Sequence, residues 1–441
     1  MPNHIFIKKK IKSFKEKIRV SSDKSISIRS VLLASQAVGV SKISNLLESE
    51  DVINALKTIK KLGINYTKKR GIYHIEGFGL NGFNIKKKIN INAGNSGTLA
   101  RLILGLLVKS KFKVRLIGDK SLSRRDFSRV IKPLRLFGVN IKSKNNKLPI
   151  EILGSDFLRP VTYYENIGSA QVKSCILLSA LNTPGTTIIK SKKSRNHTEL
   201  MLKFLNYPIK IQKKKLFDKL SIQGLSQFKS FKYNVPGDIS SASFFIVLTL
   251  LSKKSQLVIE NVNINKSRVG IITILNKMGA NIKYKNKKLY NGEEIADICV
   301  KSVSNLKSVN CSPKLNSSAI DEFLIIFLAA AKAKGISKFK NLGEMNKKES
   351  KRLDLGVNFL KLVGIKVERF DNDLNIHGNP YLSLDRNFEI KNFLKDHRIF
   401  FLSCITALTL GGKWKINDKK SANTSFPKFL KIIKKIGGKI N

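Results

Sequence analysis

The chain has 441 residues, 42% of them hydrophobic, which excludes a disordered chain and suffices for the buried cores of two domains. Its longest apolar runs are too short to cross a membrane, and the N-terminus lacks the apolar segment and cleavage site of a secretory signal, so we expect a cytoplasmic protein without membrane contact. The formal net charge of +53 comes mainly from lysines spread over nearly every segment, which indicates a compositional bias rather than the focused basic patch of a nucleic-acid-binding protein.

The four cysteines are scattered, with no CxxC pair and no histidine at metal-ligand spacing. Cys175 and Cys404 fall in apolar helical stretches and Cys299 in a strand-like segment, whereas Cys311 is predicted to lie in a loop. We therefore expect no disulfide, no metal site and no cofactor.

A repeated pattern organises the chain: an apolar-periodic helix ends at a glycine or an equivalent residue and is followed by a strand, a polar turn and a second strand. The pattern recurs at intervals of 68 to 85 residues. Its six marks are Gly63, Gly138, Asn206, Gly279, Gly364 and Gly437. Six compact α/β blocks in one chain indicate two domains of three blocks, with a break near the Pro-Gly turn of VPGD, residues 235–238.

The first motif, SSDKSISIRS, predicts a helix capped by Asp23 or a neighbouring serine, with Lys24, Ser25 and Arg29 in its first turns. A hydroxyl between two cations at a helix N-terminus suits a phosphate or a carboxylate. A capped helix with solvated basic residues explains the pattern equally well.

The second motif, NAGNSGTLAR, places Gly94 and Gly97 around Asn95 and Ser96, directly before an apolar helix that carries Arg101. Glycines let backbone N–H groups approach an anion, and the helix N-terminus adds partial positive charge. The motif lacks both the ending of a nucleotide-binding P-loop and a dinucleotide fingerprint.

The third motif, GDKSLSRRDFSRVIKPLRLFG, gathers Arg124, Arg125, Arg129 and Arg135 in a chain that otherwise favours lysine. Arginine is the residue that planar, bidentate recognition of carboxylates and phosphates requires. The alternative is a basic helix surface.

The fourth motif comprises GSAQVKSC and SKKSRNHTE, in which Ser169, Gln171, Lys173 and Ser194 offer hydrogen bonds to a polyhydroxylated ligand. His197 lies at a predicted helix start, and we interpret it as structural.

The remaining motifs combine acids with cations. Asp321 and Glu322 open a strongly apolar helix, where acids ordinarily complement the helix dipole, although a carboxylate among anion-binding groups also suits a general base. Further on, we expect one helical turn to hold Lys348, Glu349 and Arg352, and another to hold Arg398 beside Asp396 and His397. Surface ion pairs are the alternative.

In this order, the stretches DKSISIRS, GNSGTLAR, GDKSLSRRD, GSAQVKS, SRNHTE, VPGDISSAS, IDE, KESKR and DHR resemble those of the 5-enolpyruvylshikimate-3-phosphate synthase family over essentially the whole chain. The resemblance implies an α/β fold of two similar domains, each built from three βαβαββ units, with the active site in the interdomain cleft. One domain would comprise residues 1–22 and 239–441, and the other residues 23–238.

The resemblance also implies the reaction, in which the enolpyruvyl group of phosphoenolpyruvate is transferred to the 5-hydroxyl of shikimate 3-phosphate by addition and elimination of phosphate. Asp321 would deprotonate that hydroxyl and Glu349 would transfer a proton at the enol methylene. Lys24 would be a third catalytic residue, in contact with both substrates. The implied shikimate 3-phosphate contacts are Lys24, Ser25, Arg29, Ser169, Gln171, Ser194, Asp321 and Lys348. The implied phosphoenolpyruvate contacts are Lys24, Gly97, Arg125, Gln171, Arg352 and Arg398.

Three stretches depart from the family pattern: SSDKS replaces PGDKS, RRD at residues 124–126 replaces RRP or KRP, and the third departure is at Thr424. Thr424 in NTSFP stands where many family members carry a lysine that contacts phosphoenolpyruvate, so that contact stays unassigned, with Lys419 or Lys420 as the only nearby substitutes. We expect a monomer that binds these two small substrates and no nucleic acid.

Two other functions were weighed. A UDP-N-acetylglucosamine enolpyruvyl transferase would share the fold but need a reactive cysteine in a mobile loop, where only Cys311 is expected. A basic nucleic-acid-binding repeat protein would bind DNA or RNA with steep salt dependence.

Overall fold

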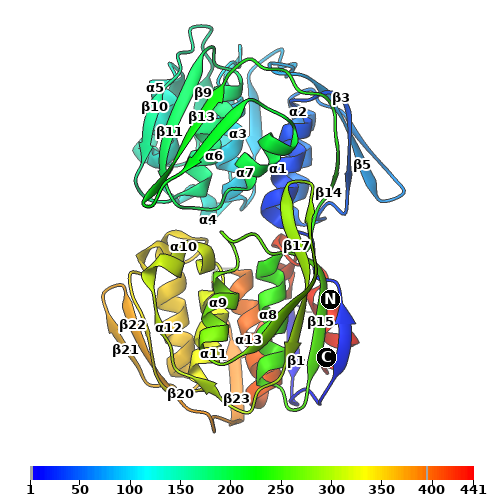
Figure 1. Cartoon of the computed structure of the whole chain (residues 1–441), viewed down its shortest axis with the longest axis vertical. Helices are drawn as coiled ribbons and strands as arrows, with labels where there is room; N and C mark the ends of the chain where they lie inside the picture. The colour runs from blue at the N-terminus through cyan, green and yellow to red at the C-terminus, as the bar shows by residue number, and fades with distance from the viewer. Residues whose placement is uncertain (1–2, 394–395) are drawn as a thin grey trace. The chain divides into compact units, whose positions relative to one another are not determined.

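The computed structural model describes residues 3–393 and 396–441. Contacts between residues divide the chain into two compact units (Figure 1). Unit 1 comprises residues 1–21, 236–289 and 294–441, and unit 2 comprises residues 22–235 and 290–293. The short segment Tyr290–Glu293 thus belongs to unit 2, although the chain on both sides of it belongs to unit 1.

Unit 2 contains three repeats of the helix-and-strand pattern. The first holds α1 (Lys24–Ala34), β3 (Val38–Ser44), α2 (Glu50–Lys61), β4 (Tyr66–Lys69) and β5 (Ile72–Phe78). The second holds β6 (Ile89–Asn92), α3 (Gly97–Leu106), β7 (Val114–Ile117), α4 (Lys120–Ser123), α5 (Ser128–Leu136), β8 (Asn140–Ser143), η1 (Lys144–Asn146) and β9 (Ile150–Leu153). The third holds β10 (Thr162–Glu165), α6 (Ala170–Leu181), β11 (Thr186–Lys192), α7 (His197–Phe204), β12 (Ile209–Lys213) and β13 (Phe217–Gln223), and β14 (Lys232–Asn234) follows.

Unit 1 contains the other three repeats. The first holds β2 (Lys15–Ile18), α8 (Ile239–Leu251), β15 (Gln256–Asn263), α9 (Gly270–Lys277), β16 (Asn281–Tyr290) and β17 (Glu293–Lys301). The second holds β18 (Leu306–Lys307), β19 (Asn310–Cys311), η2 (Pro313–Leu315), α10 (Asn316–Ala319), α11 (Phe323–Ala331), β20 (Ala333–Phe339), η3 (Gly343–Lys347), α12 (Arg352–Leu362), β21 (Val367–Phe370) and β22 (Asp373–Gly378). The third holds β23 (Leu384–Ile390), α13 (His397–Leu410), β24 (Gly411–Asn417), η4 (Lys419–Thr424), α14 (Phe429–Lys435) and, from the N-terminus, β1 (His4–Ile7).

Each repeat forms its own small sheet, and the same strand order recurs. In the order β6-β7-β9-β8, for example, the first pair is parallel and the other two are antiparallel. Three sheets are completed by distant segments: β14 pairs with β3 in unit 2, and in unit 1 β2 pairs with β15 and β1 pairs with β24. The expected six-unit α/β architecture is therefore confirmed.

The left-handed helix ends are the local cause of the repeat. All six marked residues have positive φ angles, from 54° at Asn206 to 96° at Gly138. A glycine or asparagine in this conformation ends a helix because it satisfies the last carbonyls while turning the chain away. In five of the repeats the chain then enters a strand.

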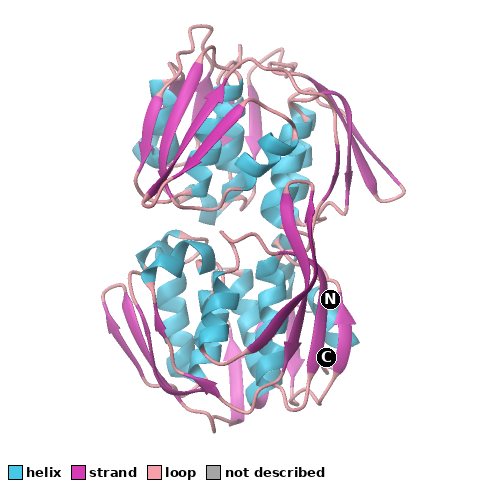
Figure 2. Ribbon diagram, viewed as in Figure 1, coloured by secondary structure: helices cyan, strands magenta, loops and turns pink. Residues whose placement is uncertain are grey.

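Three inner helices form the core of each unit: α1, α3 and α6 in unit 2, and α8, α11 and α13 in unit 1. They are mostly apolar and almost entirely buried, as the run FLIIFLAAA of α11 illustrates. Figure 2 shows the sheets of unit 1 on the outside of its helices. Because a helix surrounded by other elements buries every face, α1, α6, α8, α11 and α13 show no amphipathic stripe, whereas α3 keeps a polar side with the partly buried Thr98 and Arg101. Their ends are the only parts that can present polar groups.

Replacing Gly279 by alanine tests the cause of the repeat. No atom lies within 4 Å of the added Cβ, so the cost comes from the left-handed backbone alone, with φ of 88°. We expect Gly279→Ala to lower the free energy of unfolding by about 1 to 2 kcal/mol, and Gly279→Asn to cost less, because asparagine tolerates this region. Urea unfolding measures both. Equal stability of the alanine variant and the wild type would contradict this explanation.

Candidate active site

The sequence motifs lie at the N-termini of the inner helices. In unit 2, side chains of Asp23, Ser96 and Ser169 accept backbone N–H bonds at the starts of α1, α3 and α6. In unit 1, Asp238 and Asp396 do the same for α8 and α13. In each unit, the motif residues therefore lie at helix N-termini, where the helix dipoles contribute partial positive charge.

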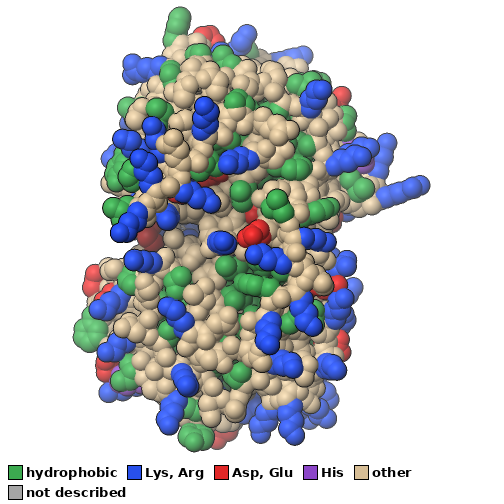
Figure 3. All heavy atoms as spheres, viewed as in Figure 1, with side chains coloured by type: hydrophobic (Ala, Val, Ile, Leu, Met, Phe, Trp, Pro, Cys, Tyr) green, Lys and Arg blue, Asp and Glu red, His purple; other side chains and the backbone are tan. Residues whose placement is uncertain are grey.

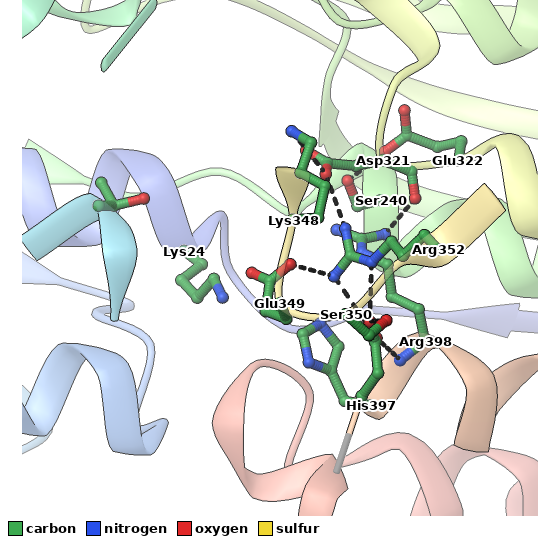
Figure 4. Close-up of polar contacts among 12 residues, drawn as sticks. Lys24, Ser240, Asp321, Glu322, Lys348, Glu349, Ser350, Arg352, His397 and Arg398 are labelled. Atoms are coloured by element: carbon green, nitrogen blue, oxygen red, sulfur yellow. Dashed lines mark hydrogen bonds and ion pairs between the residues drawn. The ribbon is translucent and has the colours of Figure 1, made fainter. Parts of the chain in front are cut away.

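In unit 1, the Arg352 guanidinium is enclosed by three carboxylates (Figure 4). Its Nε lies 2.9 Å from Asp396 Oδ2, its Nη1 3.1 Å from Asp321 Oδ1, and its Nη2 2.5 Å from Glu349 Oε2. The Ser350 hydroxyl also donates to Asp396, at 2.7 Å. Arg352 starts α12, so its five N–H donors are held at a helix N-terminus and spread over three acids.

The charges in this cluster perturb one another. Burial disfavours the charged form of Arg352, but Asp396, Glu349 and Asp321 outweigh burial and raise the arginine pKa well above its ordinary value. Burial also disfavours the charged form of Asp396 and would raise its pKa. The positive charge of Arg352, together with that of His397, outweighs burial and lowers this pKa below 3.8. Arginine and acid thus hold each other ionised inside the protein.

Two further cations contact Asp321. Lys348 Nζ lies 3.4 Å from Asp321 Oδ1, and Arg398 Nη1 donates to the Asp321 carbonyl oxygen at 2.7 Å. Lys348 and Glu349 lie before α12 and not within a helical turn with Arg352, so that expectation was wrong: the helix begins only at Arg352, after the turn η3. Asp396, His397 and Arg398 do share the start of α13, as expected.

A buried polar network joins the starts of α8 and α11, and sequence reasoning missed it. Arg268 Nη2 donates to Asp238 Oδ1 at 3.1 Å and to Ser240 Oγ at 2.9 Å. Ser240 in turn donates its hydroxyl hydrogen to Glu322, the residue before α11. The network fixes the backbone next to Asp321. Arg268 comes from a segment with no motif of its own, so only the fold reveals its partners.

In unit 2, Lys24 is not a free cation. Its Nζ lies 2.8 Å from Asp51 Oδ2, and Asp51 is buried in the first turn of α2. Sequence reasoning missed Asp51, because an acid in a first helical turn is ordinary dipole chemistry. The pair holds the lysine side chain at the N-terminus of α1.

Gly97, Arg125 and Gln171, which the family resemblance assigned to one substrate, lie around the starts of α3 and α6. A Cβ added to Gly97 would lie 2.8 Å from Arg125 Nη1 and 2.9 Å from Arg101 Nη1, so a larger residue would displace these guanidinium groups from their present positions. Arg101 donates to Gln171 Oε1 at 3.0 Å, and Arg125 donates to Asn95 Oδ1 at 2.9 Å. Arg101 of α3 and Arg125, which follows α4, thereby lie close together beside the start of α3.

Arg29 is buried and linked to α7 and α6. It donates to Thr198 Oγ1 at 2.8 Å, to Ser174 Oγ at 2.9 Å and to the Ser25 carbonyl oxygen at 3.0 Å. Lys173 is also buried, with its Nζ 2.6 Å from Glu199 Oε1. The expectation that Lys173 offers a hydrogen bond to a ligand is therefore wrong, because it neutralises an acid in the core.

Ser194 and His197 differ in their surroundings. The Ser194 hydroxyl is buried and has no hydrogen-bond partner among the described residues. His197 Nδ1 lies 2.6 Å from Glu293 Oε1, with both side chains almost fully buried, so the structural interpretation of His197 is supported. Glu293 lies in the short segment Tyr290–Glu293, which belongs to unit 2 although the chain on both sides of it belongs to unit 1.

Cys175, Cys311 and Cys404 do not offer the accessible, reactive thiol that the rival transferase needs. Cys311 lies in strand β19 and not in a loop, where we expected it. It is buried, and burial raises its pKa to about 11, so the nucleophilic thiolate is scarce at neutral pH. Cys175 and Cys404 are buried in α6 and α13, and burial raises the pKa of the Cys175 thiol to about 12.

Within the described residues, 3–393 and 396–441, no group of three or more His, Cys, Asp or Glu side chains is arranged to hold a metal ion. No helix in the same part of the chain has the length and apolarity to cross a membrane.

Residues 8–433 match the family model described as EPSP synthase (3-phosphoshikimate 1-carboxyvinyltransferase). The chain belongs to the EPSP synthase family. It is thereby a transferase of the shikimate pathway, and neither rival function is favoured. The 3-phosphoshikimate 1-carboxyvinyltransferase of Ruthia magnifica subsp. Calyptogena magnifica is 40% identical over 438 residues, which cover 99% of this chain and 98% of that protein.

Solved structures agree with this assignment. An EPSP synthase from Acinetobacter baumannii superimposes with a TM-score of 0.87 at 34% identity, over 99% of both chains. The enolpyruvyl transferase NikO from Streptomyces tendae has a TM-score of 0.77 at 14% identity, over 100% of this chain and 99% of its own, and shares the fold alone.

Thr424, where the family pattern has a lysine, lies at the end of η4 and contacts His397. Lys419 and Lys420 of the same turn are exposed, and the backbone N–H groups of both bond to Asn3. No contact in the described structure links either lysine to the Arg352 cluster.

Replacing Asp396 by asparagine tests the Arg352 cluster. Because the change leaves a buried guanidinium undercompensated, we expect a loss of about 3 kcal/mol in the free energy of unfolding at pH 7. The matched control is Asp354→Asn, whose carboxylate pairs with Arg369 at 2.6 Å near the surface. The control should lose about 0 to 1 kcal/mol. Equal losses in the two variants would contradict the cluster's importance.

The pH dependence of the same comparison has a definite sign. The folded-state pKa of Asp396 lies below its ordinary value of 3.8. The ionised Asp396 carboxylate therefore contributes its full share to the free energy of unfolding above about pH 4, and this share is lost as the pH falls through the folded-state pKa. The stability difference between wild type and Asp396→Asn should therefore be constant near neutrality and shrink in acid. Urea unfolding at a series of pH values measures it.

Proposed function

We propose that the chain transfers the enolpyruvyl group of phosphoenolpyruvate to the 5-hydroxyl of shikimate 3-phosphate, with the residue roles that follow. The hydroxyl oxygen adds to C2 of phosphoenolpyruvate while C3 gains a proton, which gives a tetrahedral ketal phosphate. Loss of a C3 proton then expels inorganic phosphate and leaves the enol ether. Both steps need proton transfer beside several anionic groups.

The unit 2 residues are assigned to substrate holding. Arg101 and Arg125 lie close together beside the start of α3, and Gly97 leaves room for both. Such a pair of guanidinium groups suits a carboxylate or a phosphate. We assign Lys24 to the same task, with Asp51 orienting its ammonium group. Ser25, Arg29, Ser169, Gln171 and Ser194 complete the proposed set, and the partnerless Ser194 hydroxyl keeps its hydrogen-bonding capacity for a ligand.

The unit 1 residues are assigned to the chemistry. Asp321 accepts from Arg352 and lies near Lys348, so its carboxylate is held in place and ionised, as a base for the 5-hydroxyl must be. The backbone carbonyl of Asp321 is held by Arg398, and its neighbour Glu322 by Ser240. These contacts restrict where the base can point.

Glu349 is the partner of Arg352 best able to move. Its side chain is 24% exposed, against 13% for Asp321 and 0% for Asp396. We propose that phosphoenolpyruvate takes the place of Glu349 at Nη2 of Arg352, which releases this carboxyl group to exchange a proton with C3. Arg398 is assigned to the same substrate.

The single observation that carries these assignments is the balanced cluster of unit 1. Three cations, Lys348, Arg352 and Arg398, lie among three acids, Asp321, Glu349 and Asp396. The three cations favour the ionised form of the neighbouring acids, and the three acids in turn limit how tightly the cations bind an anionic substrate. Because the proposed residues are divided between the two units, the expectation of an interdomain site remains a prediction, as do the monomeric state and the cytoplasmic location.

The net charge carries no argument for nucleic-acid binding. On the face drawn in Figure 3, Lys and Arg side chains are scattered singly and in small groups over each unit, with acids among them. A nucleic-acid site requires a continuous basic surface.

Turnover of defined substrates tests the proposal. Wild-type protein with phosphoenolpyruvate and shikimate 3-phosphate should release phosphate, and Asp321→Asn and Arg398→Gln should each lower kcat by about 100-fold or more while remaining folded. Asp354→Asn, a carboxylate of the same unit outside the cluster, should retain activity. Phosphate release with UDP-N-acetylglucosamine but not with shikimate 3-phosphate would overturn the substrate, and normal turnover in both variants would overturn the roles.

A further inference from the structure

The Thr424 hydroxyl lies between a ring nitrogen and a backbone carbonyl. Thr424 Oγ1 is 3.1 Å from His397 Nδ1 and 2.8 Å from the Ser421 carbonyl oxygen. His397 is the first residue of α13 and is only 4% exposed. Neither the family resemblance nor the sequence motifs give Thr424 a role.

Counting hydrogens assigns the direction of both contacts. A threonine hydroxyl has one hydrogen, and the Ser421 carbonyl has none, so their 2.8 Å contact requires the Thr424 hydrogen. Only lone pairs of Oγ1 then remain for His397 Nδ1. The 3.1 Å contact is a hydrogen bond only if Nδ1 carries a hydrogen and donates it.

We propose that Thr424 is a positioning residue that fixes His397 in the tautomer with hydrogen on Nδ1. Nε2 is then the ring nitrogen that gains and loses a proton. This inference rests on the proposed function, because it places His397 among the residues that handle protons there. Thr424 acts through the histidine and need not touch a substrate.

The surroundings of the ring fit this role. The edge of the His397 ring packs against Phe401, with the ring centres 5.8 Å apart, which restricts rotation of the imidazole. His397 stands between Asp396 and Arg398 in the chain, and its charge acts on the Asp396 carboxylate together with those of Arg352 and Glu349. The charged groups that share this corner are therefore Asp396, Glu349, Arg352 and Arg398.

Nitrogen NMR on the full chain tests the tautomer directly. The chain has only five histidines, so a His397→Gln variant identifies the His397 ring signals. With the ring neutral, the wild type should show hydrogen on Nδ1, and Thr424→Val should shift the population toward hydrogen on Nε2. Thr424→Ser, which keeps the hydroxyl, should resemble the wild type. Ser421→Ala should do so too, because it keeps the backbone carbonyl.

Turnover then separates positioning from a purely structural role. Thr424→Val should lower kcat on the order of tenfold or more and alter its pH profile, with KM for shikimate 3-phosphate little changed, and Thr424→Ser should restore both. A wild-type ring with hydrogen on Nε2, or an altered tautomer with unchanged kcat, would overturn the inference. Because the tautomer readout needs no turnover, absence of wild-type phosphate release would count against the proposed function alone.

Discussion

The rest of the candidate site depends on one buried arginine. Arg352 is 2% exposed and spreads its donors over Asp321, Glu349 and Asp396, so a loss of charge on any one of these four groups changes the charge balance of the other three. Burial makes this interdependence strong, since an uncompensated charge in the interior costs several kcal/mol. The same contacts that stabilise unit 1 therefore hold its acids ionised and in place.

The two units supply different chemistry from the same architecture. In both, buried apolar helices can offer only their N-termini to a polar ligand, so the functional side chains gather there. Unit 2 presents Arg101, Arg125 and a lysine, which suits anion binding, whereas unit 1 presents a balanced mixture of acids and cations. One repeated block thus supplies the residues for both roles that we propose, substrate holding and proton transfer.

The sequence predicted features governed by local rules. The six left-handed helix ends follow from backbone sterics, and the cap Asp23 follows from the need to satisfy N–H groups. Pairings across the chain were not predictable. Asp51, Arg268 and Glu293 find their partners only after folding, and Lys173 looks like a surface cation until the fold places Glu199 beside it. Cys311 was misplaced because a two-residue strand leaves no periodic signal.

The most direct test of this account is the unfolding free energy of an Arg352→Lys variant. Lysine keeps the positive charge but lacks the planar fork that reaches three carboxylates. The account predicts a loss of about 3 kcal/mol or more at neutral pH, because at least one buried acid loses its partner. A variant as stable as the wild type would show that charge alone suffices and that the three-way contact does not organise the site.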